Sequence, residues 1–208
     1  MTSIAGMIGE LILPRACAGC GAPGHLLCPR CKTDLAAPPF RHTPKVDTRV
    51  PVFALGPYAT PHRGVILAMK EHNNLAVRRH IGAVLAAALD HLEARGEILP
   101  GAHLVPAPTR PRSARARGGD PVSQVCHASS RPTHDVLSLI DDTPDQAALD
   151  EAARRRNLSG QLKLSAVPTQ PVIIVDDVVT TGATLQAAVE KLLAHGAHPV
   201  ACLVLAAA

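Results

Sequence analysis

The stretch Val172-Ile-Ile-Val-Asp-Asp-Val-Val-Thr-Thr-Gly-Ala-Thr-Leu185 decides the fold of this chain. It starts as an apolar run typical of a buried parallel strand. Two carboxylates follow, and small hydroxylic residues with Gly182 then precede an expected helix. A helix N-terminus presents unpaired N–H groups to an anion, and open α/β sheets bind ligands beyond the carboxyl ends of their strands. The stretch therefore predicts an anion-binding loop between a strand and a helix.

Asp176 and Asp177 need a different partner, because a phosphate would repel them. Sugar hydroxyls or a metal ion would suit these carboxylates. The alternative is a solvated strand end followed by a Thr-Thr-Gly sequence that only caps a helix. The ligand site is favoured, since a strand, two acids and a Gly/Thr helix start coincide within one short string.

Strand and helix patterns alternate outward from this stretch. The clearest helical period places Val77, Ile81, Leu85, Leu89 and Leu92 on one face. Such alternation predicts an α/β fold with a mostly parallel sheet. Strands are expected at 52–58, 103–105, 136–140, 171–175 and 199–205, and helices at 75–93, 121–128, 145–156 and 184–195.

Length and composition limit the classes of protein that need to be considered. The 208 residues suffice for one core of ordinary domain size, or a core with a small appendage. Apolar residues make up 47% of the chain, which indicates a globular protein. With no Trp, one Tyr and two Phe, few rings are available to stack on single-stranded bases. The net charge of +4 suits an anionic ligand and permits nucleic acid without demonstrating either.

Residues 1–14 are largely apolar, but they lack a basic start and are interrupted by Glu10. This pattern predicts a short amphipathic helix rather than a signal peptide. No segment reaches the roughly 18 apolar residues of a membrane-spanning helix. We therefore expect a cytoplasmic protein without membrane insertion, in which cysteines are reduced or bound to metal.

Four cysteines form the pattern C-x2-C-x7-C-x2-C, and glycines and a proline lie among them. Paired thiolates at this spacing indicate a tetrahedral, structural Zn²⁺ site with no open ligand position. The alternative is a set of free or disulfide-bonded thiols. The predicted metal ligands are Cys17, Cys20, Cys28 and Cys31.

The 172–185 string resembles the phosphoribosyl pyrophosphate (PRPP) motif of type I phosphoribosyltransferases. The resemblance implies that fold, with Asp176 and Asp177 holding the ribose 2′- and 3′-hydroxyls. It implies Mg²⁺ bound mainly to the pyrophosphate, which eases departure of that group. Purine-salvage members carry an acid where Thr180 stands, so the string resembles the orotate-type variant instead. The substrate-binding residues implied for the loop are Val178, Val179, Thr180, Thr181, Gly182, Ala183 and Thr184, of which 180–184 cradle the 5′-phosphate.

The segment Leu104-Val-Pro-Ala-Pro-Thr-Arg110 is a strand that runs into a turn punctuated by prolines. By the same resemblance it is the pyrophosphate loop, with Arg110 joining Asp176 and Asp177 in the catalytic set. An ordinary loop with a solvated arginine is the alternative. The residues implied to contact the anion are Ala107, Pro108, Thr109 and Arg110.

Arg115 and Arg117 follow in a stretch of small residues that could close over pyrophosphate. They could equally form a solvated basic face or bind nucleic-acid phosphates. Lys70, after the apolar Val65–Ala68, is a further candidate for the substrate site.

Over nearly its whole length the chain resembles the ComF family of competence-associated, phosphoribosyltransferase-like proteins. It departs from that family where Gly118 precedes Gly119-Asp120-Pro121 instead of an aromatic, an Asn and a Gln, and where Ala107 replaces a Val. The matching pieces are the Cys17–Cys31 knuckle, Val65–Lys70, Val105-Pro-Ala-Pro108, Arg115-Ala-Arg-Gly118, Gln146-x-x-Leu149, Arg155-Arg-Asn157, Gly160 and the PRPP string.

We therefore expect an N-terminal helix and zinc knuckle over 1–36, a linker over 37–51 and a phosphoribosyltransferase-like domain over 52–208. One hypothesis is an enzyme of nucleotide metabolism, a glycosyltransferase that moves ribose 5-phosphate from PRPP to an unidentified nitrogen nucleophile. The other is a non-catalytic PRPP- or phosphate-binding module that handles single-stranded DNA during competence. A homodimer is compatible with either.

Overall fold

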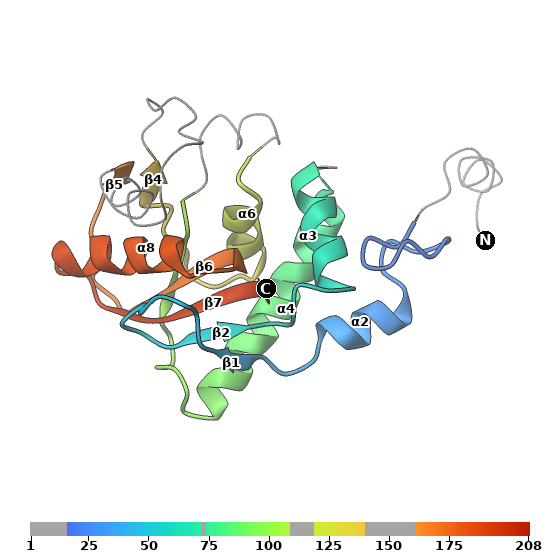
Figure 1. Ribbon diagram of the computed structural model, residues 1–208, viewed down its shortest axis with the longest axis horizontal. Coiled ribbons are helices and arrows are strands. Elements are labelled where there is room, and N and C mark those ends of the chain that lie inside the picture. Colours follow the sequence, from blue (N-terminus) through green and yellow to red (C-terminus); the bar gives the residue numbers. More distant parts are fainter. Residues whose placement is uncertain (1–15, 72–73, 109–118, 140–160) are drawn as a thin grey trace.

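The computed structural model describes residues 16–71, 74–108, 119–139 and 161–208. Its centre is a five-stranded sheet with the order β1-β2-β7-β6-β3 (Figure 1). β1 pairs antiparallel with β2, and all other neighbours are parallel, so the predicted mostly parallel α/β sheet is confirmed. The strands are β1 (Phe40–His42), β2 (Val52–Ala54), β3 (His103–Pro106), β6 (Val172–Val179) and β7 (Pro199–Ala207).

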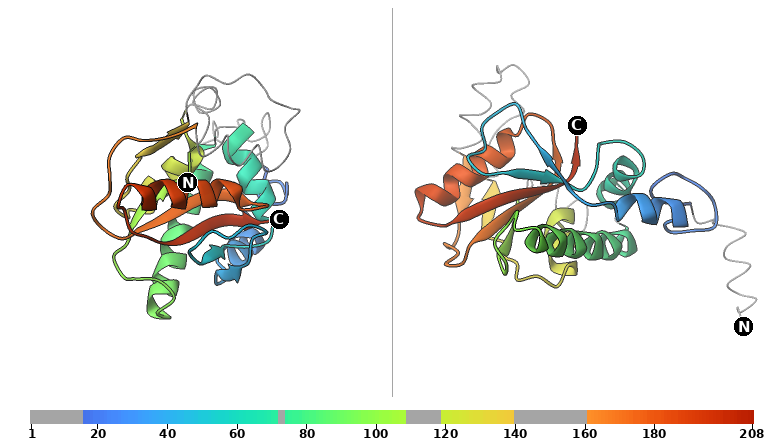
Figure 2. Two further views of the ribbon diagram at one scale, coloured as in Figure 1. Left: turned by 60° about the vertical axis from the view of Figure 1, so that its left-hand side comes forward. Right: turned by 90° about the horizontal axis from the view of Figure 1, so that it is seen from below.

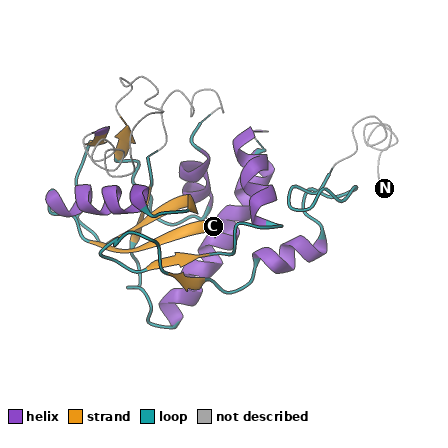
Figure 3. Ribbon diagram, viewed as in Figure 1, coloured by secondary structure: helices purple, strands orange, loops and turns teal. Residues whose placement is uncertain are grey.

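Helices cover both faces of the sheet, as Figures 2 and 3 show. α8 (Ala183–Ala194) lies on one face, while α4 (Leu75–Ala94) and α6 (Pro121–Ala128) lie on the other. Alternate residues of β6 serve the two sides, because successive side chains of a strand point to opposite faces. Ile173 and Val175 join the core cluster that contains the α4 leucines, whereas Val172 and Ile174 join the cluster that contains Leu185 of α8.

The predicted helices around the core agree closely with the structure, with α4, α6 and α8 ending within a residue of their expected bounds. Polar caps explain two of the starts. The Asn74 side chain accepts from the Val77 amide at 3.2 Å, and Asp120 accepts from the Val122 amide at 2.8 Å. α3 (His62–Glu71) carries the apolar run that begins at Val65, and no helix was predicted there.

The strand bounds differ more from prediction. β6 continues to Val179 instead of ending before the acids, because pairing with β7 extends past Asp176 to Val179, which lies opposite Ala207. β2 ends at Ala54, short of the predicted residue 58. The strand expected at 136–140 is β4 (Leu137–Leu139), which pairs antiparallel with β5 (Leu162–Leu164) in a separate two-stranded sheet. The helices expected near the N-terminus and at 145–156 lie outside the described residues.

The knuckle is continuous with the main core. α2 (Pro29–Leu35) follows the third cysteine, and the buried residues Leu27 and Leu35 belong to the same apolar cluster as Phe53 and Met69. The segment 37–51, which we expected to be a linker, supplies β1 to the central sheet. Apolar contact and strand pairing thus join the N-terminal region to the domain that follows.

Candidate functional site

The acid pair lies at the carboxyl end of β6, in the region where ligands of parallel sheets bind. Asp176 is half-buried, and its Oδ1 accepts a hydrogen bond from the Asp177 amide at 2.8 Å. Burial, followed by the charge of Asp177, raises the pKa of Asp176 to about 8. The carboxyl of Asp176 therefore holds its proton more firmly than an ordinary aspartate. A raised carboxyl pKa in a partly open position is typical of functional sites.

Lys70 meets this pair from another element. Its Nζ forms an ion pair with Asp177 Oδ2, and the two side chains are 30% and 20% exposed. Lys70 is at the carboxyl end of α3, so the helix carries a cation to the end of β6. The structure therefore brings this predicted site residue to the acids. A ligand with both hydroxyls and phosphates could contact the cation and the carboxylates together.

The loop between β6 and α8 has the form expected of an anion site. Gly182 is the N-cap of α8 and adopts φ 91° and ψ 3°, a left-handed conformation that favours glycine. Because the N-cap residue is a glycine, it offers no side-chain oxygen to the first amides of α8. The neighbouring Thr181 Oγ1 accepts a hydrogen bond from the Ala183 amide at 3.3 Å. Thr180 is exposed, and Thr184 is half-buried in the first turn. The start of α8 thus offers hydroxyls and the positive end of a helix dipole.

Residues 43–46 pack on this loop, and sequence reasoning missed them. The Val46 amide donates to the Thr181 carbonyl at 3.1 Å. A Cβ placed on Gly182 would lie 2.7 Å from Pro44 Cβ, so the backbone at this position is both left-handed and closely covered. A hollow of about 680 Å³, lined by residues 41–44 and 46–52, adjoins these contacts. The prolines that suggested a linker instead shape a segment that covers the loop.

The expected pyrophosphate side lies beside the acids. Pro106 is opposite Val175 in the parallel register, and the Ala107 amide donates to the Val175 carbonyl at 2.7 Å. Ala107 is buried and Pro108 is half-buried, so this turn follows β3 at the same end of the sheet as Asp176. The predicted residues Thr109, Arg110, Arg115 and Arg117 lie outside the described residues.

The four predicted metal ligands converge. The Sγ atoms of Cys17, Cys20, Cys28 and Cys31 all lie within 4.8 Å of one another. The Sγ atoms of Cys20 and Cys28 are 3.7 Å apart, close to the roughly 3.8 Å between sulfurs that share a tetrahedral zinc with bonds of about 2.3 Å. None of the six cysteines is in a disulfide, which removes the disulfide-bonded form of the alternative.

Local hydrogen bonds favour a thiolate at the first ligand. Burial raises the pKa of the Cys17 thiol, but backbone hydrogen bonds from Cys28, Cys20 and Gly19 outweigh burial and lower this pKa to about 6. The Cys28 amide donates to Cys17 Sγ at 3.3 Å. Four converging sulfurs suit a structural zinc ion and leave no ligand position for a substrate.

Two findings from known proteins agree with this geometry. Residues 128–208 match the family model of the phosphoribosyl transferase domain. The chain is also 26% identical over 193 residues to the DNA utilization protein YhgH of Escherichia coli K12, with 88% of this chain and 80% of that protein covered. The YhgH proteins of Escherichia coli O157:H7 and Shigella flexneri match with the same identity and coverage.

These matches support a ComF-like protein. The domain match includes β6, the acid pair, the Gly182 loop, α8 and β7. It begins at residue 128, so it leaves out Lys70 and the knuckle, whereas the YhgH matches cover most of the chain. The ComF-like protein therefore has a phosphoribosyltransferase-like region to which its N-terminal region adds one cation and four clustered thiols.

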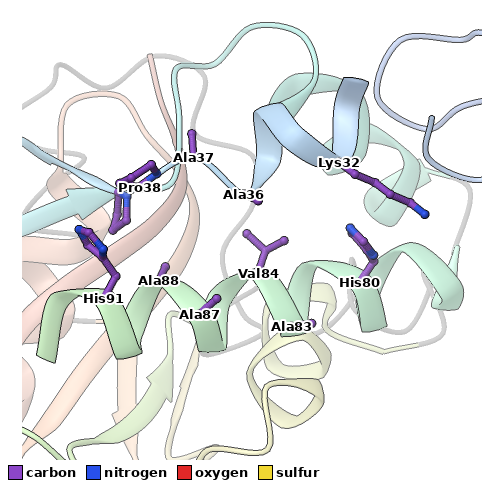
Figure 4. Close-up of a pocket in the computed structure, with 11 residues that line it drawn as sticks. Lys32, Ala36, Ala37, Pro38, His80, Ala83, Val84, Ala87, Ala88 and His91 are labelled. Atoms are coloured by element: carbon purple, nitrogen blue, oxygen red, sulfur yellow. The ribbon is translucent and has the colours of Figure 1, made fainter. Parts of the chain in front are cut away.

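A groove of about 430 Å³ lies between α2, the residues that follow it and α4 (Figure 4). Its middle is formed by alanines and Val84, and His80 and His91 lie toward its two ends. Burial and the charge of Lys32 lower the pKa of His80. None of its lining residues belongs to the predicted substrate site, so the groove is separate from the acid pair. No described helix combines the length and apolar character that crossing a bilayer requires.

Proposed function

We propose that this ComF-like protein binds PRPP with Mg²⁺ at the junction of β6 and α8 and transfers its ribose 5-phosphate to a nitrogen nucleophile. One observation carries the proposal. The acid pair, a left-handed glycine at a helix start and the turn after β3 occupy one end of the sheet. Ribose hydroxyls, a phosphate and a pyrophosphate need these three kinds of partner.

Each part of the site supports a different part of the donor. The start of α8 and Thr180–Thr184 suit the 5′-phosphate, because helix dipole, amides and hydroxyls all favour an anion. Asp176 and Asp177 suit the two ribose hydroxyls. Lys70, paired with Asp177 in the free protein, could instead contact a donor phosphate when the acids bind the sugar.

The residues present also fit a magnesium complex of the donor, since carboxylate oxygens are hard ligands. A bound Mg²⁺ would neutralise charge on the leaving pyrophosphate. The chain itself would orient the sugar, and the charge of Asp177 would stabilise an oxocarbenium-like carbon. Ala107 and Pro108 would hold the turn on which the pyrophosphate rests, and Arg110 would add a cation there.

Calorimetric titration with PRPP and Mg²⁺ tests the donor site directly. We expect saturable binding to the zinc-loaded protein, and loss of that binding in Asp176→Asn/Asp177→Asn. Glu97→Gln is the matched acid-to-amide control, because Glu97 forms only an exposed ion pair with Arg95. Equal binding by the double variant and the wild type would contradict the proposal.

Transfer needs its own measurement, because binding alone does not distinguish an enzyme from a sensor. Pyrophosphate release from PRPP is measured with bases, amines and ammonia as acceptors. We expect release with one acceptor class and none in the Asp176→Asn/Asp177→Asn variant. Binding without release from any acceptor would favour a non-catalytic PRPP-binding module.

A role in handling single-stranded DNA is the second candidate function, and the DNA utilization proteins that match most of the chain favour it. The scarcity of aromatic residues argues that contacts would be to phosphates rather than to stacked bases. Gel retardation of a single-stranded oligonucleotide at two salt concentrations tests this role. A shift that weakens steeply with salt is expected for phosphate contacts, whereas no shift at low salt removes this function.

A further inference from the structure

The helix that carries Lys70 is docked on the metal knuckle through two glycines. A Cβ on Gly64 of α3 would overlap the carbonyl oxygens of Ala18 and Gly19, so this helix approaches the knuckle backbone with no room for a side chain. A Cβ on Gly19 would in turn lie 2.8 Å from the Sγ of Cys31, a predicted metal ligand. Neither glycine has a positive φ, so close approach explains both better than backbone conformation does.

The carboxyl end of the same helix is fixed from the other side. The Met69 carbonyl accepts a hydrogen bond from Arg78 Nη2 at 2.6 Å. Arg78 is 1% exposed, and its Nη1 also donates to Gln124 of α6. The residue after Met69 is Lys70, whose Nζ meets Asp177. α3 is therefore held near its start by the knuckle and at its end by a buried arginine.

The apolar face of α3 makes these two attachments part of one body. Val65, Ile66 and Met69 are buried in the cluster that also contains Cys31 and Leu35 of the knuckle. Gly64 and Lys70 are six positions apart, roughly 9 Å along a rigid helix. A shift of the knuckle would therefore move the lysine relative to β6.

We propose that the metal-loaded knuckle positions Lys70 in the donor site, with Gly64 as the positioning residue that transmits the contact. Small zinc sites lose their local fold without metal, so metal loss would release α3 from Gly19. The consequence for ligand affinity rests on the proposed PRPP site. The consequence for the Lys70–Asp177 ion pair does not.

The first test reads Lys70 directly, without any ligand. Zinc-loaded protein, chelator-treated reduced protein and the zinc-loaded Gly64→Ala variant are acetylated with an amine-reactive reagent, and modification is followed by peptide mass spectrometry. Exposed Lys163 serves as the internal reference, and Arg63→Ala is the control on an exposed residue of α3. We expect Lys70 to react several-fold faster after zinc removal and in Gly64→Ala, approaching its rate in Asp177→Asn. An unchanged Lys70 rate in protein shown to be zinc-free would overturn the proposal.

The second reading separates release of α3 from general unfolding. Cys202 is fully buried in β7, far along the chain from the knuckle, and its alkylation reports opening of the sheet. Because metal loss should also lower the stability of the whole domain, the proposal requires the Lys70 rate to rise by a larger factor than the Cys202 rate. If Cys202 and Lys70 open together both after chelation and in Gly64→Ala, the knuckle stabilises the whole domain and has no specific positioning role.

The third reading concerns the ligand. We expect Gly64→Ala to weaken PRPP binding about tenfold, within the usual range of coupling between sites. Combining Gly64→Ala with Lys70→Met should weaken PRPP binding no further than Lys70→Met alone, because both changes remove the same contact between Lys70 and the ligand. Additive losses would overturn the link through Lys70. If wild-type protein does not bind PRPP while Lys70 reactivity depends on zinc, the proposed function fails and the positioning inference stands.

Discussion

The knuckle and the donor loop form their sites in different ways. All four knuckle thiols lie between Cys17 and Cys31, and their spacing alone brings them within reach of one ion. The donor site instead joins segments around Val46, Lys70, Ala107 and Asp177, which meet only when the sheet forms. A local metal motif is thus specified by spacing, whereas a site at the end of a sheet is specified by packing.

The two regions also differ in how they contribute to the stability of the fold. Knuckle ligands are mostly buried among apolar residues, and metal binding would contribute to folding. The donor loop keeps two carboxylates side by side and a glycine in a left-handed conformation. Substitution of a ligand should therefore destabilise the knuckle, whereas neutralising one of the paired carboxylates should stabilise the donor site.

The largest effect is expected from removing a buried ligand. Cys31→Ser should lower the free energy of unfolding by about 4 kcal/mol or more, because loss of a metal ligand is among the most disruptive single changes. Urea denaturation with a parallel zinc assay measures this. Cys126→Ala, at a buried thiol outside the cluster, should keep full zinc content. Full stability in zinc-free Cys31→Ser would show that the two regions do not differ in this way.

Gly182→Ala should lower the free energy of unfolding by about 1–3 kcal/mol, since the left-handed backbone and Pro44 both oppose a side chain. Gly196→Ala is the matched control, because Gly196 has φ 82° but open space around the added Cβ. Thermal unfolding of both variants separates backbone strain from crowding. Equal losses would mean that residues 44–46 do not press on the loop.

Asp176→Asn should stabilise the fold by about 1–2 kcal/mol at pH 7 while removing PRPP binding, as is common when a functional acid is replaced. The pKa of Asp176 is raised to about 8, so the unfolded chain releases this proton first. The protonated Asp176 side chain makes its full contribution to the free energy of unfolding below about pH 4, where the unfolded chain is protonated as well. This contribution is lost as the pH rises to about 8, and the Asn variant should lack this slope. A parallel pH dependence in wild type and variant would contradict the assignment.

The smallest effect is expected at the edge of the covering segment. Arg49 reaches Glu190 of α8 at 3.8 Å, with side chains 62% and 38% exposed. Arg49→Ala should change the free energy of unfolding by less than about 0.5 kcal/mol, because exposed ion pairs contribute little. Chemical denaturation checks this. A larger loss would mean that charge, rather than the Val46 hydrogen bond and Pro44 packing, holds the segment on α8.

Much of the fold could be predicted from the sequence. The period of Val77, Ile81 and Leu85 identified α4, and the string from Val172 identified the central strand and the start of α8. Prediction failed at 37–51 and at α3, since short strands and short apolar runs carry too little periodic signal. β4 was predicted as a strand, but its separation from the main sheet depends on pairing with Leu162–Leu164.

The sequence by itself determined the chemistry that is local. It determined the four thiols at tetrahedral spacing, the acid pair at a strand end and the glycine before a helix, because neighbours along the chain remain neighbours in space. Only the tertiary structure decided that Lys70 meets Asp177, that Pro44 covers Gly182 and that Gly64 docks on the knuckle. Those contacts join residues far apart along the chain, and close packing of the sheet, α3 and the knuckle brings them together.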